Sequence, residues 1–301
     1  MQALAPVGSI AATESIRKLC EGYFLFKPLG PTRVKGVSDP LNVYEVTGPG
    51  PLRTHFQLST RLGLTRFVGR GTEMEAIARA AEMAKAGHGR LICVVAEPGV
   101  GKSRLLYEFK ARNQSGWMVL EVFSVSHGKA SAFQPVIDLL HSYFRIAPED
   151  DTRIRREKVT GKVLALDRKL EHALPYLFGL LGLTEGHDPL AGMDAQIRRQ
   201  RILAALKRVL LRESQNQPLM VVFEDLHWID EETQAFLNML ADSIGTAKLL
   251  LLVTYRPEYS HSWGSKTYYT QVRLDPLRKE SADEMLNTFL GDDESVAHSS
   301  G

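Results

Sequence analysis

The chain has 301 residues, of which 44% are hydrophobic and 24% charged, and these proportions are typical of a soluble globular protein. A formal net charge of +2 gives no general attraction to nucleic acid or to a membrane surface. The two cysteines exclude a disulfide framework and indicate a reducing compartment. The N-terminal segment lacks the pattern of a signal peptide, and no apolar run approaches the roughly 20 residues of a membrane helix. We therefore expect a cytoplasmic protein without a membrane partner.

Residues 1–50 predict a short helix followed by β-rich runs. Residues 13–22 (TESIRKLCEG) are typical of a helix capped by Thr13 and closed by Gly22. Three strand-like runs follow, separated by Gly, Pro, Ser and Asp: YFLFKPLG (23–30), TRVKGV (32–37) and LNVYEV (41–46). Paired glycines and prolines in residues 47–54 interrupt both helix and strand, so we expect a linker over residues 51–64.

Fifty residues are few for an independent fold. The stretch EGYFLFKPLGPTRVKGVSDPLNVYEVTGPG (21–50) resembles the last helix and closing strands of class III adenylate/guanylate cyclase catalytic domains. In that family the metal-binding aspartates and the transition-state Asn/Arg pair lie upstream of this stretch, and nothing in residues 1–50 matches them. The resemblance therefore implies a C-terminal fragment of a cyclase-like domain without cyclase activity of its own. A small β-rich subdomain packed on the rest of the chain is the alternative.

From residue 65 onward, strand-like and helix-like segments alternate. Residues 71–87 carry apolar side chains at helical spacing and end at a glycine. Mostly apolar runs rich in β-branched residues predict strands at 90–96, 118–125, 218–225, 248–255 and 270–277. Strands that alternate with helices imply βαβ units, so we expect an α/β fold with a mostly parallel central sheet.

The segment AEPGVGKS (96–103) differs by one residue from the phosphate-binding pattern G-x-x-x-x-G-K-[ST]. Ala96 replaces the opening glycine at the end of the strand, where one extra methyl group is tolerable. Successive backbone N–H groups of such a loop bind phosphate oxygens, and its glycines let the backbone approach them closely. Lys102 is expected to reach the β- and γ-phosphates, and the Ser103 hydroxyl to ligate Mg²⁺. The predicted nucleotide-binding residues here are Glu97, Pro98, Gly99, Val100, Gly101, Lys102, Ser103 and Arg104.

The segment PLMVVFEDLHWID (218–230) places Glu224 and Asp225 at the carboxyl end of a buried strand, the edge where ligands bind in parallel sheets. One carboxylate can hold a magnesium ion while the other orients or deprotonates a water molecule aimed at the γ-phosphate. The order of the two is ambiguous by one residue. By analogy with NTPases that carry an acidic pair, we assign Glu224 to the metal and Asp225 to the water. The candidate metal ligands are thus Ser103, Glu224 and Asp225, and the candidate catalytic residues are the two carboxylates.

Four further polar residues lie at or after the ends of these strands. Asp230 is typical of an N-cap for the helix after it, and His227 is more simply explained by a structural role than by catalysis. Thr254 and Arg256 end the strand that, in P-loop ATPases with an inserted strand, lies between the phosphate-loop strand and the acidic strand. They are candidates for sensing the γ-phosphate, with an ordinary strand-end side chain and a surface charge as the alternative.

Five segments in this order resemble the AAA-type ATPase domain of the signal-transducing (STAND) class, which occurs behind bacterial class III cyclase domains and in large transcriptional regulators. They are FVGRGTEMEAI, AEPGVGKSRLLYEF, VVFEDLHWIDEET, LLVTYRPE and LDPLRKESADEML, and they span most of residues 65–290. The resemblance implies a P-loop NTPase three-layer fold over residues 65–301 with ATP and Mg²⁺ as ligands. It also implies that Val68, Gly69 and Arg70 lie against the adenine end of the nucleotide.

Members of this class continue into a helical lid and often into helical repeats, so the domain over residues 65–301 is expected to have a truncated lid, with weak binding and slow or absent hydrolysis. Clustered Arg and Lys over 152–169 and 198–208 are interleaved with acidic residues and lack aromatics, which favours solvated helix faces over nucleic-acid binding.

We therefore predict an ATP-binding regulatory module of a multidomain signalling protein, with the cyclase and helical-repeat domains or equivalent proteins as partners. Whether it is an ATPase enzyme is left open. The alternatives are a cyclase fragment without catalytic residues, a nucleotide-binding module of a large transcriptional regulator, and a non-enzymatic scaffold.

Overall fold

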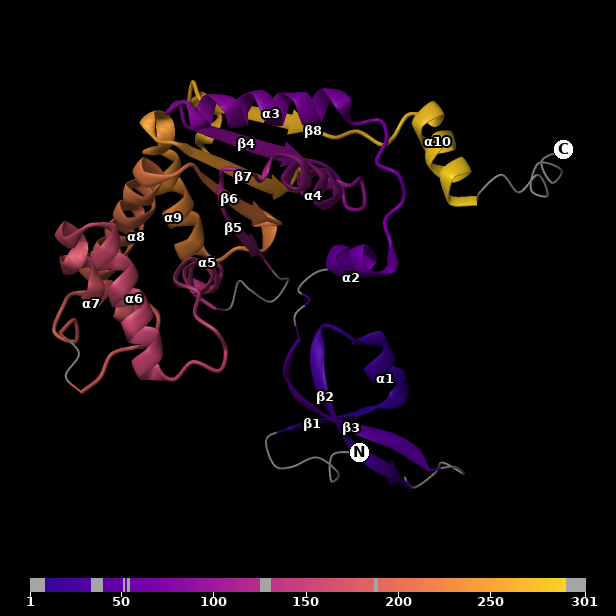
Figure 1. The fold of residues 1–301 in the computed structure, drawn as a ribbon, viewed down its shortest axis with the longest axis horizontal. Coiled ribbons are helices and arrows are strands. Elements are labelled where there is room, and N and C mark those ends of the chain that lie inside the picture. Colours follow the sequence, from indigo (N-terminus) through magenta and orange to yellow (C-terminus); the bar gives the residue numbers. More distant parts are fainter. Residues whose placement is uncertain are drawn as a thin grey trace, which may run out of the picture. The chain divides into compact units, whose positions relative to one another are not determined.

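A computed structural model describes residues 9–33, 40–50, 52, 55–124, 131–186 and 189–290 (Figure 1). The contacts divide the chain into two compact units, residues 1–66 and residues 67–301. Within the described ranges, every helix is too short or too polar to cross a lipid bilayer.

The first unit contains an antiparallel three-stranded sheet in the order β1-β3-β2, with two short helices. Its elements are β1 (Ile10–Thr13), α1 (Glu14–Leu19), β2 (Phe24–Thr32), β3 (Leu41–Pro49) and α2 (His55–Leu62). Thr13 caps α1 as predicted, since its hydroxyl accepts a hydrogen bond from the amide of Ile16 at 3.4 Å. The described core of this unit is small: its buried apolar side chains are those of Ala12, Val43 and Leu52.

Three features of the first unit differ from the sequence prediction or go beyond it. Strand β1 was not expected. Its four residues show no strand pattern in the sequence, and the strand forms by antiparallel pairing with β3. Strand β3 runs on to Pro49, and helix α2 lies within the segment expected to be a linker. Of the strand expected at 32–37, Thr32 ends β2, and residues 34–37 lie outside the described residues.

The second unit is built on a parallel sheet in the order β5-β6-β7-β4-β8. Its strands are β4 (Arg90–Val95), β5 (Met118–Phe123), β6 (Leu219–Glu224), β7 (Leu249–Tyr255) and β8 (Tyr269–Arg273). All five lie where the apolar runs predicted strands. The inner strands β6 and β7 are buried along their whole length, because each has helices on both faces and a strand on both sides.

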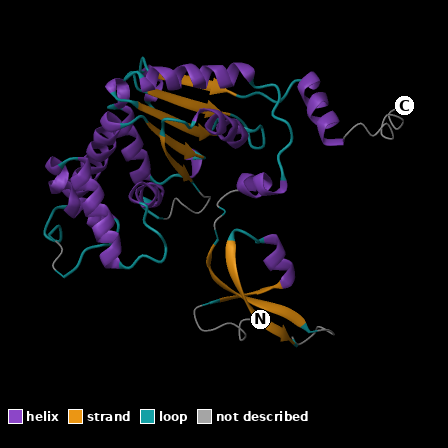
Figure 2. Cartoon of the chain, viewed as in Figure 1, coloured by secondary structure: helices purple, strands orange, loops and turns teal. Residues whose placement is uncertain are grey.

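Helices cover both faces of this sheet (Figure 2). The helices of this unit are α3 (Gly71–Lys85), α4 (Lys102–Asn113), α5 (Gln134–Phe144), α6 (Thr152–Leu166), α7 (Leu174–Leu180), α8 (Ala195–Asn216), α9 (Glu231–Ala241) and α10 (Lys279–Leu290). Of these, α3 and α4 pack in the core on one face of the sheet, and α5 to α9 in the core on the other. Short 3-10 turns lie at Arg168–Ala173, Leu226–Trp228, Ile244–Thr246 and Trp263–Ser265.

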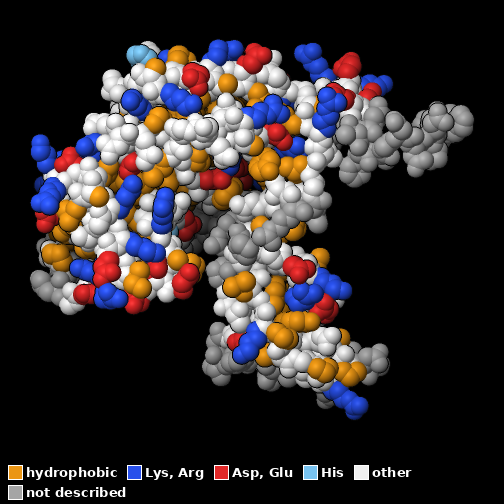
Figure 3. All heavy atoms as spheres, in the orientation of Figure 1, with side chains coloured by type: hydrophobic (Ala, Val, Ile, Leu, Met, Phe, Trp, Pro, Cys, Tyr) orange, Lys and Arg blue, Asp and Glu red, His pale blue; other side chains and the backbone are white. Residues whose placement is uncertain are grey.

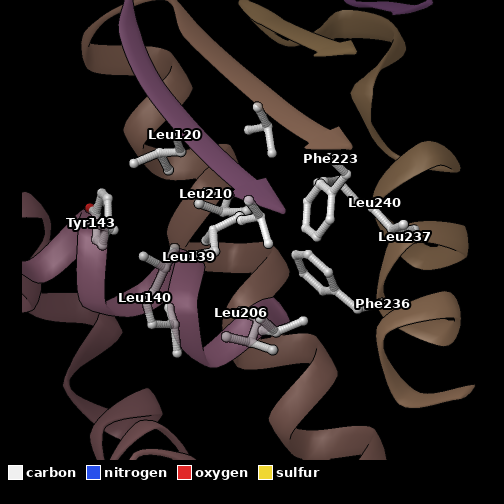
Figure 4. Packing of buried hydrophobic residues seen from close by; sticks show 14 of the residues in the cluster. Leu120, Leu139, Leu140, Tyr143, Leu206, Leu210, Phe223, Phe236, Leu237 and Leu240 are labelled. Carbon is white, nitrogen blue, oxygen red and sulfur yellow. The ribbon is translucent and has the colours of Figure 1, made fainter. Parts of the chain in front are cut away.

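Alternate residues of each strand enter two separate hydrophobic cores, because successive side chains of a strand point to opposite faces. On β7, Leu250 and Leu252 pack with α3 and α4, whereas Leu251 and Val253 pack in the core formed with α5 to α9. The larger core contains the ring of Phe223 against Phe236, with leucines of α5, α8 and α9 around them (Figure 4). The fold is therefore the three-layer α/β arrangement that the sequence predicted.

The two basic runs lie on α6 and α8, each of which buries an apolar stripe in the larger core. Their charged side chains have acidic neighbours: Arg153 pairs with Glu157 at 2.7 Å, and Arg199 with Glu232 at 2.5 Å. Figure 3 shows basic and acidic side chains interspersed on the face in view. The runs thus form the charged faces of amphipathic helices.

Candidate nucleotide-binding site

The phosphate-loop candidate connects the end of β4 to the start of α4 (Figure 1). Gly99 and Gly101 both adopt left-handed backbone conformations, with φ of 78° and 105°. A Cβ atom at either position would meet nothing within 4 Å, so the backbone conformation, rather than a lack of space, calls for glycine. Ala96 is buried and does not have a positive φ, so alanine is unstrained at the position of the missing glycine.

Lys102 begins α4, and its side chain folds back on this loop. Its Nζ donates hydrogen bonds to the carbonyl oxygens of Ala96 at 2.8 Å and Glu97 at 3.1 Å. Burial lowers the pKa of Lys102, and the negative charge of Asp225 acts in the opposite direction. The loop therefore holds an ammonium group on its own carbonyls, which a more negative ligand can replace as partner.

Glu224 is the last residue of β6 and is only 3% exposed. Burial raises the pKa of its carboxyl group, while a hydrogen bond from Ser103 and the charge of Lys110 lower it. The structure thus brings Ser103 and Glu224, which are 121 positions apart in the sequence, into contact. The other carboxylate oxygen, Oε2, is buried and has no hydrogen-bond partner among the described residues.

Asp225 follows directly but lies in a different environment. Its backbone is left-handed, with φ 62° and ψ 50°, and the residue is half-buried. Asp and Asn tolerate this conformation better than most residues do. The amide of Asp225 donates a hydrogen bond to Thr254 Oγ1 at 2.9 Å, and Thr254 is fully buried at the end of β7. Thr254 therefore holds the backbone turn that carries the Asp225 carboxylate.

The expected strand order is present: β7 lies between the loop strand β4 and the acidic strand β6. Arg256 follows β7, and its guanidinium lies over the Trp228 ring at 5.7 Å from the centroid, with Glu258 at 4.0 Å. The charges that act on Lys102 are those of Asp225, Arg256, Glu258 and Glu97. The sheet thus gathers the loop, the acidic pair and both strand-end candidates at one edge.

The remaining predicted residues lie beside the loop. Glu97, Pro98 and Gly99 are exposed, and Val100 is half-buried. Arg104 forms an ion pair with Glu108 on its own helix at 2.7 Å. Val68 and Arg70 are buried before α3, and Gly69 between them has a φ of 68°. The Arg70 guanidinium donates to the carbonyl of Val100, which brings this segment against the loop.

The AAA ATPase domain family matches residues 66–253 of this sequence. The chain belongs to this family. Its members bind nucleotide, typically with Mg²⁺, and the strand order and loop described above are those of a P-loop NTPase domain.

Individual relatives of this AAA domain are distant. The uncharacterized protein R02095 of Rhizobium meliloti (strain 1021) is 27% identical over 289 residues, or 92% of this chain, and the chain spans 27% of that protein's length. Among solved structures, Cdc6p from Pyrobaculum aerophilum has a TM-score of 0.45 and 13% identity, with 74% of this chain and 49% of that chain covered. The STAND protein with a tetratricopeptide repeat sensor, PH0952 from Pyrococcus horikoshii, has a TM-score of 0.36 and 16% identity, with 76% and 26% covered. The family assignment therefore rests on the sequence match and not on these structures.

The structure also places two further residues beside this site: Lys110, which the sequence pattern did not indicate, and His227, for which it favoured a structural role. Lys110, two turns after the loop, forms an ion pair with Glu121 on β5, and its pKa is lowered by burial and raised by the charge of Glu224. His227 is buried, and neither ring nitrogen has a hydrogen-bond partner within the described residues. Burial lowers the pKa of His227, and the charges that act on it include Asp225 and Lys102. No local pattern marks either residue, because their neighbours come from other strands.

The donor set of this AAA domain fits a magnesium ion. Mg²⁺ prefers oxygen ligands and usually keeps several waters while it bridges one or two protein oxygens to phosphate. The Ser103 hydroxyl and the Glu224 carboxylate, whose buried Oε2 lacks a partner among the described residues, provide such oxygens side by side. The described residues hold no cluster of three or more His, Cys, Asp or Glu side chains that could bind a metal by themselves. The protein oxygens therefore suit a metal that arrives with phosphate.

Proposed function

We propose that this AAA domain binds ATP with Mg²⁺ and serves as a nucleotide-dependent regulatory module, with at most slow hydrolysis. One observation carries the proposal: within the described residues Lys102 donates only to loop carbonyls, while the Ser103 hydroxyl beside it lies near a buried carboxylate whose Oε2 has no partner there. Such an arrangement is complementary to a triphosphate and a divalent cation, which would supply the missing partners for both groups.

Each residue at this edge then has a distinct part. The backbone amides between Gly99 and Ser103 bind phosphate oxygens, and Lys102 leaves the loop carbonyls for the β- and γ-phosphates. Ser103 and Glu224 hold the magnesium ion, which neutralises charge on the phosphates when bound. Asp225 orients the attacking water, because its carboxylate stands on a turn held by Thr254 instead of inside the strand. Arg256 supplies positive charge near the γ-phosphate.

The surroundings of the two carboxylates support this order of roles. Glu224 is almost completely buried next to Ser103, the other proposed metal ligand, whereas Asp225 is half-buried and accessible to water. The adenine is proposed to lie near Val68, Gly69 and Arg70, where the backbone of Val68 and Gly69 can contact it. The side chain of Arg70 is engaged within the protein.

We also propose that the module works inside a longer signalling protein, with cyclase-like and helical-repeat domains or equivalent proteins as partners. The Rhizobium meliloti relative supports this, because the chain spans about a quarter of its length. The first unit, residues 1–66, is proposed to be the end of the cyclase-like domain. The small described core of this unit supports the proposal, because so few buried side chains are typical of a part of a larger domain.

The first test is the binding of a fluorescent ATP analogue to the wild-type chain and to Lys102→Ala. Loss of a charge-assisted phosphate contact should weaken binding about tenfold or more. Lys248→Ala is the matched control, because Lys248 is an exposed lysine before β7, at the opposite edge of the same sheet. Equal affinity of Lys102→Ala and the wild type would refute the proposed phosphate site.

The second test concerns the metal. Mg²⁺ should strengthen binding of the ATP analogue to the wild type and lose this effect in Glu224→Gln, which keeps the size of the side chain but removes its charge. Glu75→Gln, on an exposed part of α3, is the control and should retain the magnesium effect. Release of phosphate that stops in Asp225→Asn would establish hydrolysis. Retention of the full magnesium effect in Glu224→Gln would contradict the metal assignment.

A further inference from the structure

The side chain of Arg70 joins three segments that lie far apart in the sequence. Its Nη1 forms an ion pair with Glu73 Oε1 at 3.1 Å in the first turn of α3. Its Nη2 donates to the carbonyl of Val100 in the phosphate loop at 3.2 Å and to the carbonyl of Asp275 at 2.7 Å. Asp275 belongs to the connection from β8 to α10. With 8% of its surface exposed, Arg70 is one of the few buried cations in the described chain.

The contact with Val100 acts directly on the phosphate loop. Val100 lies between Gly99 and Gly101, and its carbonyl shares a peptide plane with the amide of Gly101. In a trans peptide the C=O and N–H bonds point in opposite directions, and no cis peptide occurs among the described residues. By binding the Val100 oxygen, Arg70 turns the Gly101 amide away from itself and fixes its direction. A phosphate loop depends on the direction of such amides.

A second contact links the same segment to α10. Gly69 precedes Arg70 and has a φ of 68°. A Cβ atom at Gly69 would lie 2.6 Å from Ser281 Oγ and 2.9 Å from Ser281 Cβ, on the first turns of α10. Glycine at 69 therefore lets α10 approach closely. Residues 69 and 70 thus touch both the phosphate loop and the segment that follows β8.

The energetics favour coupled movement of the two partners. A buried guanidinium that loses one of its acceptors leaves an unsatisfied charged donor, which is costly. A change in the Val100 carbonyl when phosphate enters the loop therefore alters how Arg70 is shared between Val100 and Asp275. Arg70 Nη2 donates to both carbonyls, so the strength of its hydrogen bond to Asp275 depends on whether phosphate occupies the loop.

We propose that Arg70 is a positioning residue that couples nucleotide occupancy of the phosphate loop to the position of the β8–α10 connection. The inference rests on the proposed nucleotide binding and adds the route by which it reaches the helical region after the sheet. Coupling is reciprocal, so the position of α10 in turn affects nucleotide affinity.

The test uses the full chain and amide hydrogen exchange over residues 274–284, with and without ATP analogue and Mg²⁺. In the wild type, the nucleotide should change the exchange rate of this segment. In Arg70→Ala, this change should disappear, and affinity for the analogue should fall about five- to tenfold. Arg70→Lys keeps the charge but not the two-pronged geometry, so it should restore affinity in part and the exchange response little. Arg79→Ala, an exposed arginine on α3, should behave as the wild type does.

Gly69→Ala provides a variant that leaves Arg70 in place. The added methyl group should displace α10 and increase exchange over 274–284 without nucleotide, and the additional change Ser281→Gly should partly reverse this. If the wild type fails to bind the analogue, the proposed function falls and the coupling falls with it. If the wild type binds but Arg70→Ala and Arg70→Lys keep both the affinity and the exchange response, the coupling alone is refuted. Absence of any exchange response in a binding-competent wild type refutes it as well.

Discussion

The positions of the phosphate-loop motif have different physical requirements. Gly99 and Gly101 have left-handed backbones, whereas Ala96 ends a strand without a positive φ. The pattern G-x-x-x-x-G-K-[ST] treats its first glycine and its last as equivalent, but in this chain only the later glycines carry the conformational requirement. This explains how a loop with a departure from the pattern can keep the backbone shape that the pattern describes.

Substitutions at these positions should separate the two requirements. We expect Gly99→Ala and Gly101→Ala each to destabilise the protein by about 1–2 kcal/mol, because an alanine in a left-handed backbone is strained. Both should weaken binding of an ATP analogue, since relief of the strain moves the amides. Ala96→Gly should leave affinity within about twofold of the wild type. Thermal denaturation and fluorescence titration of the three variants measure these effects, and tight binding by Gly99→Ala would contradict them.

His227 has a polar ring in a buried environment. Its imidazole is buried, and neither nitrogen has a partner within the described part of the chain. A buried polar group without a hydrogen bond lowers stability by about 1–3 kcal/mol. Proteins keep such groups mainly where a ligand or water uses them.

We expect His227→Leu to raise the free energy of unfolding of the nucleotide-free protein by about 1 kcal/mol, because the apolar side chain removes the unpartnered nitrogens. The same variant should bind the ATP analogue more weakly, since leucine cannot donate or accept a hydrogen bond near Asp225 and Lys102. Urea denaturation and titration with the analogue measure the two effects. A loss of stability in His227→Leu would mean that the imidazole has a structural partner.

At the scale of elements, caps and connections join segments that local patterns treat separately. Asp230 caps α9 as predicted, since its Oδ1 accepts hydrogen bonds from the amides of Glu232 and Thr233. The same oxygen accepts the amide of Phe133, a left-handed residue at the start of α5 and 97 positions away. The sequence indicated the cap through the run Asp-Glu-Glu, but the second task of this carboxylate depends on the packing of α5 against α9.

The connection from β7 to β8 contains a histidine that must stay neutral. His261 Nδ1 accepts a hydrogen bond from the amide of Trp263 at 3.2 Å, so the other nitrogen carries the proton and donates to Tyr255 Oη at 2.6 Å. The imidazole stacks on Trp263 at 4.6 Å and also lies near Tyr259 and Tyr269. Burial lowers the pKa of His261. Protonation of Nδ1 would remove an acceptor and place a charge among aromatic rings.

This geometry predicts a loss of stability on the acidic side. The folded pKa of His261 lies below the unfolded value of about 6.5, so its contribution is complete above pH 6.5 and is lost as the pH falls toward and below the folded pKa. The facing tyrosines stay neutral in this range, since their pKa values are raised. Thermal denaturation between pH 5 and pH 8 should show a weaker pH dependence in His261→Phe than in the wild type. Equal slopes would contradict the assignment, and the lowered pKa values of His141 and His227 contribute equally to both proteins.

At the scale of the whole molecule, every candidate site residue lies in the second unit. The candidates run from Val68 to Arg256, and the contacts divide the chain after Arg66. The second unit has two extensive cores, whereas the first buries few apolar side chains in its described part. Stability grows with the share of surface that folding buries.

We therefore expect a shortened chain that starts at Phe67 to fold and to bind the ATP analogue within about twofold of the full chain. Residues 1–66 alone should not unfold cooperatively, because a core of this size offsets too little conformational entropy. Circular dichroism during heating and the same fluorescence titration measure both. Loss of binding on removal of residues 1–66 would mean that the first unit contributes to the site.

The sequence by itself determined the five parallel strands, the loop between β4 and α4 and the caps of α1 and α9. It could do so because these features depend on residues that are close in the chain: apolar runs, glycines before a helix, and a polar side chain at a helix start. Strand β1 and helix α2 were missed, because a four-residue strand depends on its partner and a short helix carries a weak pattern.

Only the tertiary structure decided which of these residues meet. The order of the strands places Thr254 beside the acidic strand, the packing of α4 brings Ser103 to Glu224, and Arg70 reaches a carbonyl 205 positions away. Packing between segments also buries His227 without a described hydrogen-bond partner. It places Lys110 beside Glu121 as well. The physical reason is that charge, desolvation and hydrogen bonding act over a few ångströms of space, whereas a sequence pattern records only separation along the chain.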